Sequence, residues 1–164
     1  MLTMTWNVKI NGNWAEVDPD LTGSVEEIAE LFGDASITAA TEVEEVEDLP
    51  EGVRVPTVGA LLDVCEAAQE AACIVGSDDD DVCAVLAAVA DCYGGRVTPD
   101  IARDLAGDFV GIFASAKAFA QNYLAGYMDI PDALWPFIDW ERLGDSAAGD
   151  FHWVDLPAGF AVFR

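Results

Sequence analysis

Residues 5–17 read TWNVKINGNWAEV, and this stretch decides how the fold begins. Apolar and polar side chains alternate on both sides of Asn11-Gly12, as they do in strands with one buried face. Asn-Gly accepts the positive φ angles of a type I′ turn, which joins two antiparallel strands. The sequence therefore predicts a β-hairpin near the start of the chain.

A helix is predicted directly after the hairpin, over about residues 25–32. Ser24-Val25-Glu26-Glu27 has the form of a capping box, in which the serine side chain accepts from a first-turn amide and the glutamate reaches back. Gly33 suits the position just after the helix, and residues 36–41 have the composition of a third strand. Residues 1–48 are thus expected to form a small αβ unit.

The middle of the chain, residues 49–107, has the periodicity of helices. Thr57 can cap a helix whose apolar side chains recur at helical spacing as far as Ala72. A second helix is expected from the Asp78–Asp81 run to Gly94-Gly95. A third opens at Thr98-Pro99, because proline is favoured at the first helical position.

The last part, residues 108–164, mixes strands and helices. Residues 108–113 favour a strand and 117–127 an amphipathic helix, followed by a closing hairpin of 151–154 with 160–163. The chain as a whole is predicted to have an α+β fold. We expect an elongated chain of small subdomains: an N-terminal hairpin/αβ unit, a central helical unit and a C-terminal αβ unit.

The net charge is the strongest indication of function. Thirty-one Asp and Glu oppose seven Lys and Arg, giving −24, yet 52% of the residues are hydrophobic. A disordered acidic tail lacks that apolar content, so the charge belongs to a folded surface. At the charge density of duplex DNA, this charge corresponds to about 40 Å of helix. A compact chain of this length is also roughly 40 Å across. We therefore expect a surface that competes with nucleic acid for a basic groove.

The candidate partner-binding residues are carboxylates in the acidic runs that recur along the chain. Carboxylates would stand in for phosphates and gain from counterion release as DNA does. The candidates are Glu42, Glu44, Glu45, Glu47, Asp48, Asp63, Glu66, Glu70, Asp78, Asp79, Asp80, Asp81, Asp100, Asp104, Asp129, Asp132, Asp139 and Glu141.

No catalytic residue, metal ligand or cofactor site is predicted. No spacing places one carboxyl of a pair in an apolar pocket, as acid-base catalysis requires. His152 stands between Phe151 and Trp153, where a packing role is favoured. Residues 18–23 begin like an EF-hand loop, but the twelfth position, which should be Glu, is Ala29.

The cysteines and the hydropathy indicate the compartment. Cys65, Cys73, Cys83 and Cys92 form no C-x-x-C pair and the chain has one histidine, so a zinc site is not expected. Small thiols packed between helices are predicted, with a disulfide joining two helices as the alternative. No run of about 18 apolar residues and no signal peptide pattern is present, which predicts a cytoplasmic protein.

The C-terminal part carries a family resemblance. Ile130-Pro131, then the segment Phe137–Leu143, Gly149-Asp150-Phe151 and the closing Ala161–Arg164 together resemble the ArdA antirestriction family of mobile elements and phages. The resemblance implies an elongated, three-part αβ protein, often dimeric, that mimics bent duplex DNA. Such a protein occupies the DNA groove of type I restriction-modification enzymes in the bacterial host and is not itself an enzyme.

Two other hypotheses fit the same composition. A housekeeping protein of a halophile would carry an acidic, lysine-poor surface as an adaptation to its solvent. A binding module for another basic partner, such as a CRISPR effector, a polymerase or a nucleoid protein, would need the same field. Unfolding in the absence of molar salt would distinguish the halophilic protein from the two binding proteins.

Overall fold

The hairpin predicted at the start of the chain is confirmed by the computed structural model, which describes residues 1–164. Strand β1 (Trp6–Ile10) pairs antiparallel with β2 (Asn13–Val17). Asn11 and Gly12 between them have φ angles of 50° and 78°, as a type I′ turn requires. Trp6, Val8 and Ile10 are buried on one face of the sheet, and Asn7 and Lys9 point to the other.

The third strand lies later than predicted. Strand β3 (Glu45–Glu47) pairs with β1, giving the order β2-β1-β3. The prediction for residues 36–41 is wrong, because that segment turns back on itself. The amide of Thr38 donates to Thr41 Oγ1 at 2.8 Å, and the Thr41 amide donates to the Thr38 carbonyl at 3.0 Å. Local β propensity favoured residues 36–41, whereas pairing with β1 decided the outcome.

Helix α1 (Val25–Phe32) begins with the predicted capping box. The Glu27 amide donates to Ser24 Oγ at 3.2 Å, and the Ser24 amide donates to Glu27 Oε2 at 3.0 Å. A further bond from the Gly23 amide to Glu27 is the main reason that the pKa of Glu27 is lowered. Gly33 ends the helix in the left-handed conformation, so both predicted ends of α1 are confirmed.

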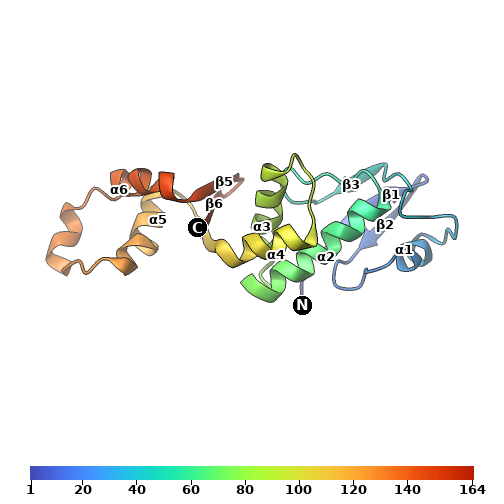
Figure 1. Cartoon of the computed structure of the whole chain (residues 1–164), viewed down its shortest axis with the longest axis horizontal. Coiled ribbons are helices and arrows are strands. Elements are labelled where there is room, and N and C mark those ends of the chain that lie inside the picture. The colour runs from blue at the N-terminus through green and yellow to red at the C-terminus, as the bar shows by residue number, and fades with distance from the viewer. The chain divides into compact units, whose positions relative to one another are not determined.

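Three helices follow, as predicted for the middle of the chain. They are α2 (Val58–Val75), α3 (Asp79–Cys92) and α4 (Pro99–Asp108). Thr57 caps α2 by accepting from the Ala60 amide at 3.2 Å, and Asp78 caps α3. Helices α2 and α4 pack side by side (Figure 1). Alanines make up much of the buried surface of α2 and α3, and their small side chains let helices approach closely.

The chain divides into two compact units, Met1–Asp108 and Phe109–Arg164, which we call the acidic unit and the C-terminal unit. The division lies one residue from the boundary predicted after residue 107. The boundary predicted after residue 48 falls inside the acidic unit. There the isolated bridge between Glu42 and Thr57 connects the first sheet with the start of α2.

The C-terminal unit has its own antiparallel sheet, in the order β4-β6-β5. Its strands are β4 (Phe109–Phe113), β5 (His152–Leu156) and β6 (Gly159–Phe163), and its α-helices are α5 (Ala116–Asn122) and α6 (Trp140–Ala147). The helix predicted over residues 117–127 ends at Asn122. The chain continues in short 3-10 turns over Leu124–Tyr127 and Asp132–Phe137, and a third covers Ala148–Asp150.

An aromatic cluster forms the core of the C-terminal unit. The ring of Phe119, which is fully buried, lies 5.1 Å from the rings of both Phe151 and Trp153. Gly144 of α6 lets that helix touch α5, since a Cβ there would lie 2.1 Å from the Ala116 carbonyl oxygen. In neither unit does any helix combine the length and apolarity needed to cross a membrane.

Candidate functional site

The predicted partner-binding carboxylates all reach the solvent. Asp63, Glu70, Asp79 and Asp81 are half-buried and the other candidates are exposed. No Asp or Glu anywhere in the chain is buried. The charge is thus available to a partner, but several of these side chains also have partners inside the protein.

The charge is divided very unequally between the two units. The acidic unit holds 24 acidic and four basic side chains, a net charge of −20 over 108 residues. The C-terminal unit holds seven acidic and three basic side chains, a net charge of −4. Acidic runs do occur along the whole chain, but the field comes mainly from residues 1–108.

The open face of the first sheet carries three of these charges. Glu47 on β3 and Glu16 on β2 both lie opposite Asn7 of β1, and Glu45 lies opposite Lys9. Strands lie about 4.8 Å apart, so Glu16 and Glu47 are separated by about 10 Å across the sheet. Glu16 was not among the predicted residues, because only strand pairing places it beside Glu47.

In the segment that leads into β3, one of the predicted carboxylates stabilises the β1–β2 hairpin. Glu44 accepts from the Gly12 amide at 3.0 Å and lies 3.8 Å from Lys9 Nζ. Asp48, just after β3, has a positive φ of 68°. Glu42, Glu45 and Asp48 remain exposed.

Three of the predicted carboxylates, Asp63, Glu66 and Glu70, form a stripe along helix α2. At 1.5 Å per residue the stripe extends about 10 Å along the helix. No lysine or arginine lies on α2 itself, but Arg103 of α4 supplies a cation. Arg103 Nε donates to Glu70 Oε2 at 2.8 Å, and this bond lowers the pKa of Glu70. Arg103 Nη1 also reaches Asp100 at 3.4 Å.

The run of four aspartates at the start of α3 divides into two pairs by role. Asp78 caps the helix by accepting from the Asp80 amide at 3.0 Å. Asp79 accepts from the amide and the hydroxyl of Thr3. Burial opposes ionisation of Asp79, but the bonds from Thr3 prevail and its pKa is lowered. Asp80 and Asp81 make no such bond.

Asp81 differs electrostatically from the other aspartates of the run. Burial and the neighbouring charges of Asp78 and Asp80 raise its pKa. Asp81 therefore takes up a proton more readily than an ordinary aspartate as the pH falls. A partner's cation placed beside it would relieve the repulsion that these three carboxylates exert on one another.

The remaining candidates lie on α4 and in the C-terminal unit. Asp104 is exposed on α4, and Asp129, Asp132 and Glu141 are exposed in the C-terminal unit. Asp139 caps α6 by accepting from the Arg142 amide at 3.1 Å.

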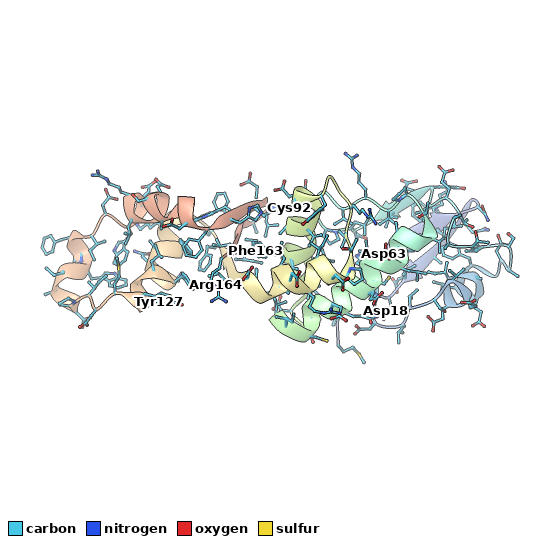
Figure 2. The ribbon with its side chains drawn as sticks, in the orientation of Figure 1. Asp18, Asp63, Cys92, Tyr127, Phe163 and Arg164 are labelled. Carbon is cyan, nitrogen blue, oxygen red and sulfur yellow. The ribbon has the colours of Figure 1, made fainter.

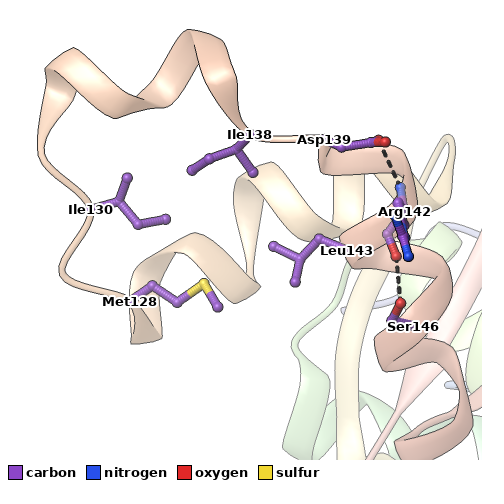
Figure 3. A pocket seen from close by; sticks show the side chains of 7 residues that line it. All are labelled: Met128, Ile130, Ile138, Asp139, Arg142, Leu143 and Ser146. Atoms are coloured by element: carbon purple, nitrogen blue, oxygen red, sulfur yellow. Dashed lines mark hydrogen bonds between the residues drawn. The ribbon is translucent and has the colours of Figure 1, made fainter.

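An apolar surface in the C-terminal unit was not predicted from the sequence. Met128, Ile130, Ile138 and Leu143 point into an open hollow of about 490 Å³ (Figure 3). Next to it in the chain, Tyr127 and Phe137 are 74% and 84% exposed. Hydrophobic residues spaced along a segment of 3-10 turns do not follow the period of a helix or a strand, so the pattern gave no signal.

The thiols and the histidine belong to no group of side chains that could hold a metal ion. Cys65 is buried, and burial raises its pKa to about 12, while that of Cys83 is raised to about 11. No disulfide joins the helices, and Cys73 and Cys92 are exposed rather than buried as predicted. Cys73 lies in the last turn of α2, where little packs against it. The structure contains no group of three or more His, Cys, Asp or Glu side chains that could hold a metal ion.

Comparison with known proteins adds no relative. No protein-family model matches the chain, and no curated protein matches it either.

Proposed function

We propose that this protein is an acidic DNA mimic that binds the DNA-binding groove of a type I restriction-modification enzyme and inhibits it. The single observation that supports this most directly is the net charge of −20 on a folded unit of 108 residues with no buried carboxylate. Repulsion among these charges destabilises the folded state, so a surface of this kind is expected to serve a function.

The magnitude fits a short piece of duplex. A compact chain of 108 residues has a radius of gyration of about 13 Å, and hence a diameter of about 34 Å. Twenty charges at the density of duplex DNA also span about 34 Å, which is close to one turn of the double helix. The acidic unit therefore carries about as much charge per unit length as the ligand it would replace.

The choice of partner comes from the family resemblance of the C-terminal part. On this proposal the protein acts in the cytoplasm of a bacterial host, needs no cofactor and catalyses no reaction. The other basic partners, a CRISPR effector among them, share the same electrostatic requirement and are the competing outcomes of the test.

We also propose that the protein forms a homodimer through its C-terminal unit. Monomeric proteins rarely expose large contiguous apolar patches. Here exposed aromatic side chains adjoin an apolar hollow in the unit with little net charge, where a second copy meets little repulsion.

The decisive experiment measures binding to a panel of purified type I enzymes, with duplex DNA as competitor, between about 50 and 200 mM salt. Mimicry predicts that DNA and the protein exclude each other. For six or more phosphate-like contacts, affinity should fall at least about a thousandfold over that range. Binding that ignores salt, or a ternary complex with DNA, would contradict the proposal. Unfolding of the protein at low salt would favour the halophilic alternative.

A further inference from the structure

Two arginines of the acidic unit have no acidic partner. Arg54 and Arg96 are both exposed, and neither forms an ion pair within 4.0 Å. The other two cations of the unit are paired: Lys9 lies 3.8 Å from a glutamate and Arg103 lies 2.8 Å from another. On a surface with 24 carboxylates, two unpaired guanidinium groups are the exception.

The fold brings these two arginines to the same hollow. The amide of Arg54 donates to the carbonyl of Gly95 at 2.9 Å, which joins the two loops that carry them. Arg54 and Arg96 line one hollow of about 300 Å³, and Asp63 also lines it. Asp63 is labelled on α2 in Figure 2.

A glycine holds one of the arginines in place. Gly95 has a φ of 95°, and a Cβ there would lie 2.8 Å from Cγ and 2.9 Å from Cδ of Arg54. The absence of a side chain at Gly95 therefore lets the stem of Arg54 lie directly against the loop. Packing of this stem against the loop restricts the Arg54 side chain, which lowers the entropy lost when its guanidinium binds.

The chemistry of the hollow favours a single carboxylate. A guanidinium binds a carboxylate through two parallel N–H···O bonds. The other walls come from Pro56, Ala60 and Val97, which suit the apolar stem of an acidic side chain. With two arginines and Asp63 the hollow has a net charge of about +1, so it would attract one carboxylate and not a second.

The unit's own field excludes free anions. Its net charge of −20 repels a small anion in solution. An acidic side chain on a basic protein does not meet this barrier, because the attraction between the two proteins carries it to the surface.

We propose that the Arg54–Arg96 hollow binds a carboxylate side chain of the basic partner protein and thereby fixes the register of the complex. This inference rests on the proposed function. An array of like charges attracts a basic groove but specifies its position poorly, whereas one contact of opposite sign within that array specifies it well.

The test compares a double variant with a control variant against the type I enzyme that the wild type binds. R54A/R96A removes the hollow's cations, and K117A removes a cation from an exposed side chain without an ion pair in the C-terminal unit. We expect R54A/R96A to raise Kd about tenfold, mainly through faster dissociation. The control should bind as the wild type does or slightly more tightly. If R54A/R96A lowers the melting temperature, R54Q/R96Q, which keeps most of each stem, replaces it.

The outcomes separate the two proposals. Attraction by net charge alone predicts that R54A/R96A binds more tightly, since the protein becomes more negative. If the wild type binds and R54A/R96A binds equally well or better, the proposed role of the hollow is overturned. DNA mimicry is unaffected by that result. A wild type that binds no enzyme of the panel overturns the proposed function and this inference with it.

Discussion

The two units of this protein expose opposite kinds of surface. The acidic unit carries a net charge of −20, and its exposed large apolar side chains, such as Leu21 and Leu31, are scattered. The C-terminal unit carries −4 and gathers five exposed large apolar side chains between Tyr127 and Phe137. Charge attracts at long range and is screened by salt, whereas apolar area acts on contact and is not. On the functions proposed above, the two units would therefore bind different partners.

The largest effect is expected from Phe137. Its side chain is 84% exposed beside the apolar hollow, and aromatic anchors dominate the energy of protein interfaces. Replacing it by serine should weaken the dimer by about 2 kcal/mol, roughly thirtyfold in the dissociation constant, measured by sedimentation equilibrium. Leu21→Ser, at a position 72% exposed in the acidic unit, is the matched control and should leave the dimer intact. An equal effect of both substitutions would remove the contrast between the units.

A smaller effect is expected from the charges of the first sheet. The triple variant E16Q/E45Q/E47Q neutralises its open face, and D129N/D132N/D145N removes the same charge from the C-terminal unit. The first should weaken partner binding about tenfold, and the slope of log K against log salt should fall by up to about three. The second should change both quantities much less. If the C-terminal triple had the larger effect, the binding surface would have to be reassigned to that unit.

The smallest effect concerns the link between α2 and α4. Arg103 lowers the pKa of Glu70 in the folded state below its usual 4.5. The bond therefore adds stability that is present above the unfolded pKa and is lost as the pH falls through the folded one. Glu70→Gln should lower the free energy of unfolding only slightly at pH 7, since both side chains are partly exposed and solvent screens the pair. Urea titrations at a series of pH values below 4.5 should show the difference disappearing as the pH falls. Glu66→Gln, on the same helix, should show no such loss.

Local chemistry explains why much of the fold could be predicted. Asn11-Gly12, the pairing of Ser24 with Glu27 and the cap at Thr57 act over a few residues, and each was visible in the sequence. Strand β3 was not, because Glu45–Glu47 is a strand only through its pairing with β1. Its two glutamates would be disfavoured by propensity alone.

The site shows the same limit. The sequence supplied the total charge and most of the candidate carboxylates, but neither the place of Glu16 beside Glu47 nor the relief of Glu70 by Arg103. The hollow of Arg54 and Arg96 depends on a backbone bond between loops 41 residues apart in sequence. Contacts of that range follow from packing and leave no periodic signal in the sequence.

The divided roles within the Asp78–Asp81 run bear on how such a surface evolves. Asp78 accepts a hydrogen bond from the Asp80 amide, and Asp79 accepts two from the amide and the hydroxyl of Thr3, so a substitution at either one disturbs the start of α3. Asp80 and Asp81 accept no hydrogen bond of that kind. A glutamate at either position, or an acidic residue at a neighbouring surface position, would contribute equally to the overall negative field. Proteins that evolve from this chain should therefore retain Asp78 and Asp79 and vary more freely at Asp80 and Asp81.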